Sequence, residues 1–378
     1  MRSSKFRFRW GAAALVSAGL AVSACGGATQ AGNSAGNSTE VKTIAFAVNT
    51  QSAGQFVTLA DNFVNFGKQI GIKVDVYNNN GSGPTAISNA QLMVAAKPDV
   101  IVDFPPVADA TARVGDIFKA SGIPCVAMNI PIPNCAFFNQ SQERFAQLET
   151  DNFAKLMKQR GWDGTNTTVV IEQASEFGPT VNIAVTKFYE DMSKTIPGFQ
   201  PTLASAITPQ TTTISATGVQ VDAGVTVDRS FTTFSQALQT IPAGRHIVIY
   251  AVSDDDIVGS YRALVNAHRE GDAMMAGFGG DEHAIEGLRS NPAWVGDSDG
   301  FFTYWGEFLV AMAVGMKQGL TPPALTLSPM VVLTKDNVNN YFDAGSSTPK
   351  QMPPLPPESQ WLIKTGVLQK FKNVSGLS

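Results

Sequence analysis

The chain has 378 residues, which is more than one hydrophobic core usually holds, so its length favours two lobes with appended segments. Its 44% hydrophobic and 15% charged residues exclude a disordered chain. A formal net charge of -4 lacks the basic excess that binding to phosphate backbones requires, so nucleic acid is excluded as the main partner. Three Cys and three His are too few for a zinc ribbon or an iron–sulfur cluster.

The N-terminus has the pattern of an export signal. The first ten residues carry four basic side chains and no acidic one, and residues 11–22 form an apolar run. This run is shorter than the roughly 20 residues that span a bilayer, so residues 1–24 are predicted to be a signal peptide. The sequence Val22-Ser23-Ala24-Cys25-Gly26 resembles the lipobox of bacterial lipoproteins. That resemblance implies a diacylglycerol thioether on Cys25; the alternative is a free Cys after an ordinary cleavage site.

A lipid on Cys25 would tether the exported protein to the outer face of the cell membrane, on the periplasmic or cell-wall side, without spanning it. Residues 25–40 are small, polar and almost uncharged, as is typical of a flexible linker. Cys125 and Cys135 remain as a pair, and in an oxidising compartment they could close a ten-residue loop as a disulfide. The alternative is a buried free thiol at Cys125, which lies in an apolar run.

From residue 41 onward, short β-branched runs alternate with segments of helical period. Within residues 54–70, for example, apolar side chains recur three or four positions apart. Apolar strands separated by helices build parallel sheets that are covered on both faces. The pattern predicts two α/β lobes, with strands at 41–49, 73–80, 99–104 and 125–129 and then at 167–173, 246–252, 273–280 and 294–300.

Two segments do not fit this alternation. Residues 211–226 are rich in Thr, Val and Gly without helical period, and predict an irregular hairpin or loop. Residues 346–378 form a Pro-rich C-terminal extension, predicted to run extended across the surface before a short final helix.

Residues 41–345 resemble the type I periplasmic sugar-binding proteins of ABC importers, typified by ribose-binding protein. The resemblance rests on the order and spacing of four places: Gln55-Phe56, Gly122-Ile123-Pro124, Ser253-Asp254 and Gly277-Phe278-Gly279-Gly280. It implies two Rossmann-like lobes joined by a three-crossover hinge, with the chain crossing near residues 135, 299 and 326. The lobes would comprise residues 41–135 plus 300–325 and residues 136–299 plus 326–345.

Ligands of open α/β sheets collect at the carboxyl ends of the strands. The side chains at the predicted strand ends are mostly amides, phenylalanines and carboxylates, which suit hydroxyl groups and the C–H faces of a sugar or polyol. The predicted ligand-binding residues are Asn49, Gln51, Gln55, Phe56, Asn78, Phe104, Asn129, Gln173, Phe177, Asn182, Ser253, Asp254, Asp281 and Asp299.

Several of these positions have a purely structural alternative. Asp254 is also a good helix N-cap. Phe56, Phe104 and Phe177 could be core residues, and residues 78–83 could be only a turn.

The chain departs from the pentose-binding members of the family at three places. Asn129-Ile130 stand where those relatives have Asp-Arg, Ala184 stands where an Arg is expected, and Asp281 is displaced from the Gly-Phe-Asp-Gly turn. The loss of cationic groups argues against anionic ligands and favours a neutral sugar, polyol, deoxy sugar or amino sugar.

The resulting hypothesis is a monomeric, extracytoplasmic solute-binding lipoprotein that captures a small hydroxylated solute and delivers it to an ABC permease, with no catalytic residues, no cofactor and no metal. One alternative is a ligand receptor for a sensor kinase or chemoreceptor. A second is a metal-dependent hydrolase that uses Asp254-Asp255-Asp256 and Asp281-Glu282-His283.

Overall fold

The computed structural model describes residues 40–52 and 54–377. The predicted lipidation site Cys25, the signal peptide and all of the linker except Glu40 lie outside the described residues. Within the described residues, no helix is both long enough and apolar enough to cross a bilayer.

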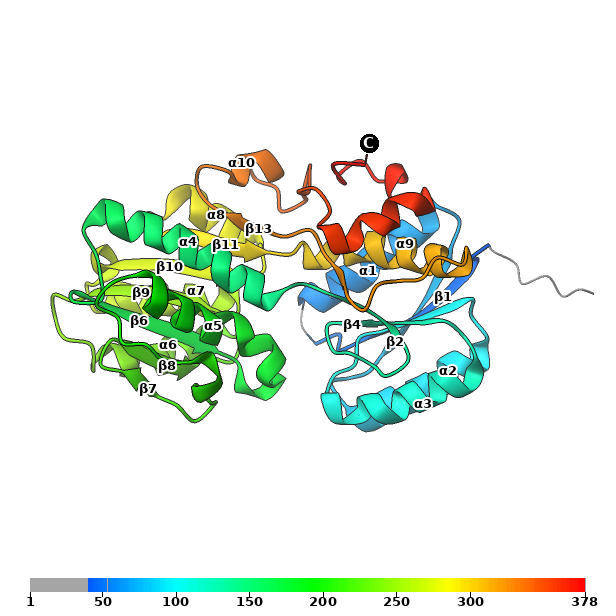
Figure 1. Cartoon of the computed structure of the whole chain (residues 1–378), viewed down its shortest axis with the longest axis horizontal. Helices are drawn as coiled ribbons and strands as arrows, with labels where there is room; N and C mark the ends of the chain where they lie inside the picture. The colour runs from blue at the N-terminus through cyan, green and yellow to red at the C-terminus, as the bar shows by residue number, and fades with distance from the viewer. Residues whose placement is uncertain (1–39, 53, 378) are drawn as a thin grey trace, which may run out of the picture. The chain divides into compact units, whose positions relative to one another are not determined.

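The first lobe is a parallel sheet in the order β12-β5-β4-β3-β1-β2. Strand β1 shows that both faces of this sheet are covered. Ile44, Phe46 and Val48 belong to one hydrophobic cluster, and Ala45 and Ala47 belong to another. Helices α1 and α9 cover the first face, and α2 and α3 cover the second (Figure 1). The strands are β1 (Thr43–Val48), β2 (Lys73–Asn78), β3 (Val100–Asp103), β4 (Cys125–Met128), β5 (Ala136–Asn139) and β12 (Thr326–Leu327), and the helices are α1 (Gly54–Gln69), α2 (Gly83–Ala96), α3 (Thr111–Ser121) and α9 (Trp305–Lys317).

The second lobe is a seven-stranded sheet in the order β13-β11-β10-β9-β6-β8-β7, parallel except at its two edges. Helices α4 and α5 pack together, and α6, α7 and α8 form a second group. The strands are β6 (Thr167–Gln173), β7 (Thr213–Ser215), β8 (Gly218–Asp222), β9 (His246–Ala251), β10 (Ala273–Phe278), β11 (Trp294–Asp299) and β13 (Val331–Leu333), and the helices are α4 (Gln142–Arg160), α5 (Pro179–Thr195), α6 (Val227–Leu238), α7 (Asp254–Asn266), α8 (Glu282–Ser290) and α10 (Val338–Tyr341).

The two α/β lobes predicted from the sequence are therefore present. Within residues 211–226, β7 and β8 form an antiparallel pair with a register shift, so this segment is the irregular edge of the second sheet. Short 3₁₀ helices complete the fold: η1 (Ala108–Ala110), η2 (Ser175–Phe177), η3 (Ala204–Ala206), η4 (Glu270–Asp272), η5 (Phe302–Tyr304), η6 (Pro357–Thr365) and η7 (Leu368–Lys370).

The chain passes between the sheets after β5, after β11 and after β12. Two of these crossings differ from the expected positions near residues 135 and 326. Residues 136–139 form β5 of the first sheet, where Val126 pairs with Ala136. Residues 326–327 form β12 of the same sheet and pair with Phe138 and Asn139. The first lobe thus extends to residue 139 and includes β12.

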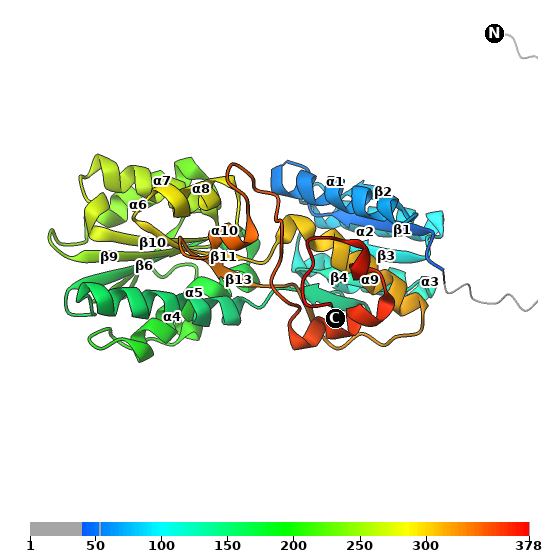
Figure 2. The ribbon, with the colours of Figure 1, turned by 90° about the horizontal axis from the view of Figure 1, so that it is seen from above.

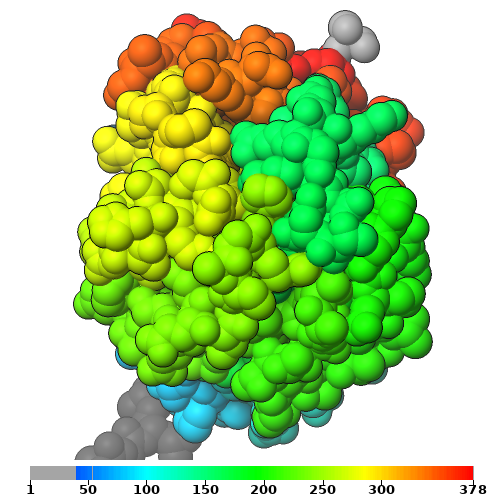
Figure 3. Space-filling view, turned by 90° about the vertical axis from the view of Figure 1, so that its left-hand side faces the viewer, coloured from blue at the N-terminus to red at the C-terminus, as the bar shows by residue number. Residues whose placement is uncertain are grey.

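The C-terminal extension makes a further passage between the lobes. Helix α10 packs against α8 of the second lobe, where Arg289 donates hydrogen bonds to the backbone oxygens of Phe342 and Asp343. Helices η6 and η7 pack against α9 of the first lobe. Ser359 Oγ there accepts a hydrogen bond from Leu327 N at 2.9 Å. Figure 2 shows this red segment beside α9, and Figure 3 shows the orange segment along one side of the second lobe. Residues 346–377 are thus an integral part of the packing.

The parallel strands β4 and β5 are joined by residues 129–135 alone. Parallel neighbours usually need a connection of a dozen or more residues. Cys125 at the start of β4 and Cys135 just before β5 are joined in the structure by a disulfide, with Cα atoms 4.8 Å apart. The bridge fixes the point at which this short loop returns to the beginning of the sheet.

The double variant Cys125→Ser, Cys135→Ser is expected to lose about 2–3 kcal/mol of unfolding free energy, because the open loop of the denatured chain regains its entropy. Urea unfolding of the exported protein measures this loss. Reductant should lower the stability of the wild type by a similar amount and leave the double variant unchanged. Equal stability of both proteins under oxidising conditions would contradict the prediction.

Candidate functional site

A cavity of about 170 Å³ lies between the two sheets and is lined by both lobes. We call it the interlobe pocket. Every segment that lines it follows or starts at the carboxyl end of a strand, where parallel sheets leave backbone groups and helix N-termini exposed. Its wall consists of Asn49, Gln55, Phe56, Phe104, Pro106, Asn129, Ile130, Gln140, Gln142, Phe177, Val181, Val225, Val252, Ser253, Phe278, Gly279, Gly300 and Phe302.

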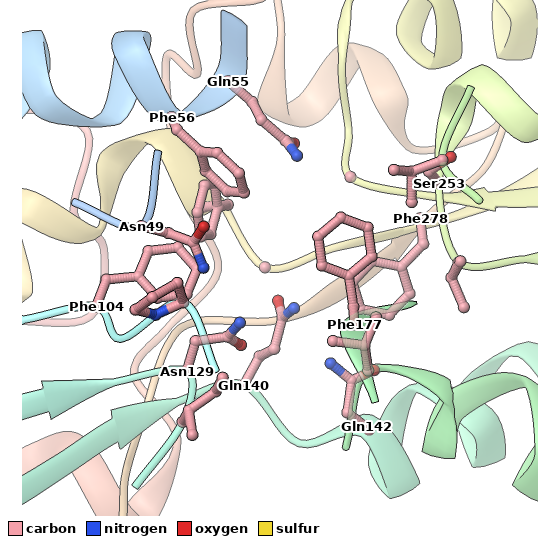
Figure 4. A pocket seen from close by; sticks show the side chains of 18 residues that line it. Asn49, Gln55, Phe56, Phe104, Asn129, Gln140, Gln142, Phe177, Ser253 and Phe278 are labelled. Atoms are coloured by element: carbon pink, nitrogen blue, oxygen red, sulfur yellow. The ribbon is translucent and has the colours of Figure 1, made fainter. Parts of the chain in front are cut away.

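The first lobe supplies amides and an aromatic cluster. The rings of Phe56, Phe104 and Phe302 contact one another edge to face, with centroids 5.4–6.1 Å apart. In Figure 4, Asn49, Gln55 and Asn129 lie on the same side of the pocket as Phe56 and Phe104. Asn49 uses one amide hydrogen to bind Pro105 O at 3.3 Å, which fixes its side chain at the end of β1. The arrangement presents amide donors and acceptors beside aromatic faces.

Asn129 occupies its place because the chain turns sharply after β4. Its backbone has φ 65°, a left-handed conformation that Asn tolerates better than most residues. Its backbone N–H donates to Phe138 O at 3.1 Å. The backbone oxygen of Asn129 accepts a hydrogen bond from Asn139 Nδ2 at 3.4 Å. The backbone is thus held by β5, and the side-chain amide remains directed at the pocket (Figure 4).

Gln140 lies on the first crossing between the lobes, and Gln142 is the first residue of α4. The Oε1 atom of Gln142 is buried and has no hydrogen-bond partner among the described residues. Gln140 packs over Gly300, where a Cβ would lie 2.1 Å from Gln140 Oε1 and would displace the end of that side chain. Neither Gln residue was predicted, because the predicted first lobe ends at residue 135 and no strand was expected at residues 136–139.

Seven of the predicted ligand-binding residues line the pocket: Asn49, Gln55, Phe56, Phe104, Asn129, Phe177 and Ser253. Phe56 and Phe104 also pack into the aromatic cluster, and Ser253 also caps α7 by accepting a hydrogen bond from Asp256 N. The other wall residues were not among the predicted ligand-binding residues, because they are apolar or Gly: Pro106, Ile130, Val181, Val225, Val252, Phe278, Gly279, Gly300 and Phe302.

Four predicted amide residues lie away from the pocket wall. Gln51 is exposed in the turn after β1. Asn78 Oδ1 accepts a hydrogen bond from Asn80 N, so residues 78–83 form the turn that was the alternative interpretation. Gln173 Nε2 donates to Pro209 O. The side chain of Asn182 accepts a hydrogen bond from Ala174 N and donates one to Ala174 O. The polar groups of the last three residues are thus used to hold loops.

The three predicted carboxylates are also away from the pocket wall. Asp281 is the N-cap of α8 and accepts from Ala284 N at 2.9 Å. Asp254 accepts from Asp281 N at 3.0 Å, and Asp299 accepts from Phe301 N at 2.6 Å. Asp254 and Asp299 are 3% and 2% exposed and lie behind the glycine turn at residues 277–280. The hypothesis that Asp254 contacts a ligand is not supported by this geometry.

The glycines of the turn at residues 277–280 leave room for these buried carboxyl groups. A Cβ on Gly277 would lie 2.4 Å from Asp254 Oδ1 and 2.7 Å from Asp297 Oδ2. A Cβ on Gly280 would lie 2.3 Å from Asp299 Cγ. Asp297 Oδ1 accepts a hydrogen bond from Gly280 N at 2.9 Å, whereas Asp254 Oδ1 and Asp297 Oδ2 are buried without a hydrogen-bond partner among the described residues.

Burial raises the pKa of all three acids. It raises the pKa of Asp299 to about 8, helped by the nearby charges of Asp254 and Asp281. Burial, and then the charge of Asp281, raises the pKa of Asp254 to about 7. Burial and the neighbouring Asp254 raise the pKa of Asp297 well above its usual value. The cluster therefore favours the neutral, protonated form.

Asp255, Asp281 and His283 bring their ligand atoms within 4.8 Å of one another, among the described residues. Asp281 and His283 are exposed, and none of the three lines the interlobe pocket. Consecutive acids at the start of α7 stabilise its N-terminus through the helix dipole. The geometry gives no support to the metal-dependent hydrolase considered above.

Because its pKa is raised, Asp299 binds more protons in the folded than in the unfolded chain between about pH 4 and pH 8, so unfolding free energy falls as pH rises through this window. Asp299→Asn keeps an oxygen that can accept from Phe301 N and cannot ionise. We expect a smaller loss of unfolding free energy between pH 5 and pH 8 in this variant, measured by urea unfolding. The exposed substitution Asp228→Asn is the control; a loss as large as that of the wild type would contradict the prediction.

Comparison with known proteins identifies the fold. The family model described as "Periplasmic binding protein domain" matches residues 44–314. A periplasmic solute-binding protein of an ABC transporter from Actinobacillus succinogenes 130z, solved with bound D-allose, is 16% identical with a TM-score of 0.66, over 79% of this chain and 100% of that chain. An ABC transporter solute-binding protein from Mycobacterium smegmatis, solved with glycerol, is 16% identical with a TM-score of 0.64, over 82% and 99% of the two chains.

A third similar structure is the ABC transporter solute-binding protein of Bacillus halodurans C-125 with bound myo-inositol, 14% identical with a TM-score of 0.65, over 80% of this chain and 98% of that chain. No curated protein matches the sequence. The family match covers well over half of the chain, and the two sheets have the expected topology. The chain therefore belongs to the periplasmic binding protein domain family and has the two-lobe type I fold of its sugar-binding members.

Proposed function

We propose that this protein is the extracytoplasmic solute-binding lipoprotein of an ABC importer, which captures a small neutral hydroxylated solute and delivers it to a membrane permease. The observation that carries the proposal is the uncharged wall of the interlobe pocket: six amide or hydroxyl side chains, five phenylalanines and no Asp, Glu, Lys, Arg or His. A sugar, polyol or amino sugar is the class of solute proposed. Amides donate and accept hydrogen bonds, and aromatic rings cover C–H faces, which together suit such compounds.

Capture follows from the position of the pocket between two separately folded sheets. A solute that contacts both walls has more contacts when the lobes are closed on it than when they are apart. Its binding therefore shifts the population toward the closed arrangement, by as much as the affinities for the two states differ. The closed surface is then the form that a permease would recognise.

The similar structures support this class of solute. They were solved with D-allose, glycerol and myo-inositol bound, all of which are neutral and hydroxylated. The absence of charged side chains from the pocket wall agrees with such ligands, because a phosphate or carboxylate would be desolvated without a cationic partner.

A thermal-shift screen of neutral sugars and polyols is expected to show stabilisation by at least one compound, about 2.7 kcal/mol at a concentration of 100 Kd. Gln55→Ala should weaken binding of that compound roughly five- to tenfold, the value of a net hydrogen bond. Gln51→Ala is the matched control, because Gln51 is also an exposed Gln beside the start of α1 but does not line the pocket. Equal losses in both variants would place the site elsewhere, and no stabilisation by any compound would refute the ligand class.

The lipid anchor predicts a separate result. Cys25→Ser should move the protein from the membrane fraction to the soluble extracytoplasmic fraction, because an acyl chain contributes about 0.8 kcal/mol per buried methylene to membrane binding. Fractionation and detergent partitioning measure the change, with Cys135→Ser as a control that keeps the lipidation sequence. Retention of Cys25→Ser in the membrane fraction would contradict lipidation at this residue.

A further inference from the structure

The wall that the second lobe contributes to the interlobe pocket is almost entirely apolar. Phe177 and Val181 come from the segment after β6, Val225 follows β8, and Val252 and Phe278 lie at the ends of β9 and β10. The polar side chains on this wall are Ser253 and Gln142, and the hydroxyl oxygen of Ser253 already accepts a hydrogen bond from Asp256 N.

The polar residues that could have faced the solute from this side are engaged elsewhere. Gln173 and Asn182 hold loops, and the carboxyl groups of Asp254 and Asp299 are buried behind Gly277 and Gly280. A ligand hydroxyl group buried against this wall would lose its hydrogen bonds to water and would find few hydrogen-bond partners in the protein.

Two of these apolar residues are in states that are unfavourable for their residue type, one in its backbone conformation and one in its exposure to water. Val225 has φ 53°, a left-handed conformation that is a genuine outlier for a β-branched residue, and it directly follows Gly224 at φ 66°. Phe177 is 39% exposed, although a large aromatic ring is usually more buried. Both side chains lie on the pocket wall, so apolar surface is displayed there at the expense of backbone strain and exposure to water.

The opposite wall is different. Asn49, Gln55 and Asn129 come from the first lobe, and Gln140 comes from the crossing. The side chains of Gln55, Asn129 and Gln140 have no hydrogen-bond partner among the described residues, so their donors and acceptors are free for a ligand. The free amide groups are therefore concentrated on the first-lobe side, beside the aromatic cluster of Phe56, Phe104 and Phe302, whereas the second-lobe side is mostly apolar.

From this asymmetry we infer that the solute is amphipathic: a neutral sugar or cyclic polyol that carries an apolar substituent, such as an aryl or branched alkyl group. Its hydroxyl groups bind the amides of the first lobe, and its substituent contacts Phe177, Val225 and Phe278 of the second. This inference rests on the proposed function and narrows its ligand class. The substituent would gain free energy in proportion to the apolar area that it buries.

Isothermal titration calorimetry of the exported protein with paired methyl and phenyl β-glycosides of glucose, galactose and ribose tests it. For at least one sugar, the phenyl glycoside should bind tenfold or more tightly than the methyl glycoside. Phe177→Ala should reduce this ratio to threefold or less, and Phe177→Leu, which keeps an apolar side chain, should preserve most of it.

The outcomes separate the two claims. If a free sugar or methyl glycoside binds as tightly as its phenyl partner, the amphipathic ligand is refuted and the proposed function stands. A ratio that Phe177→Ala leaves at tenfold would also refute it, because the aryl group would then lie elsewhere. If no sugar, polyol or glycoside binds, both claims fall.

Discussion

The common direction of the parallel strands is the constraint on which the site depends. In each sheet the strands next to the pocket run parallel, so their carboxyl ends and the loops that follow them lie at one edge. The crossings after β5 and β11 bring these two edges to opposite sides of a single pocket. Residues as distant in sequence as Asn49 and Phe302 become neighbours for this reason.

The buried acids of the second lobe determine the character of one wall. Each of these acids is held within the lobe by a backbone hydrogen bond: Asp281 N donates to Asp254, Gly280 N to Asp297 and Phe301 N to Asp299. The glycines at 277 and 280 leave room for the carboxyl groups. With the acids behind this turn, the surface in front of it is formed by Phe278, Gly279 and Val252. A buried carboxyl cluster and an apolar pocket wall are thus two consequences of one glycine-rich turn.

The sequence was sufficient to predict the two α/β lobes, because β-branched runs and helical periods alternate clearly along most of the chain. Seven of the predicted ligand-binding residues line the pocket, among them Asn49, Phe104 and Asn129, which directly follow β1, β3 and β4. Strand β5 escaped because four residues after a short loop carry little periodic signal, and with it Gln140 and Gln142 were missed.

The remaining errors concern the direction in which side chains point. Asp254, Asp281 and Asn182 lie at strand ends or helix starts as expected. The side chain of each, however, accepts a hydrogen bond from a backbone N–H of a nearby loop or helix. Asn, Asp and Ser at such positions serve capping and ligand binding equally well, and one sequence does not distinguish the two. The sequence likewise does not indicate that apolar residues such as Val225 and Phe302 line a pocket, because an apolar residue is ordinarily predicted to belong to the hydrophobic core.

The C-terminal extension adds a physical condition to capture. The hinge that the fold implies consists of three crossings, and residues 344–356 form another connection, between α10 on the second lobe and η6 on the first. Its ends are held on both lobes, by Arg289 at Phe342 and Asp343 and by Leu327 and Thr326 at Ser359 and Trp361. Any change in the angle between the lobes must therefore be absorbed by this segment as well as by the three crossings. Met352 within it is fully buried, and its backbone N–H donates to Asn373 O at 2.7 Å, so this part of the segment is packed in place. A hinge movement of the kind proposed above would thus have to be accommodated by this C-terminal connection as well as by the three crossings.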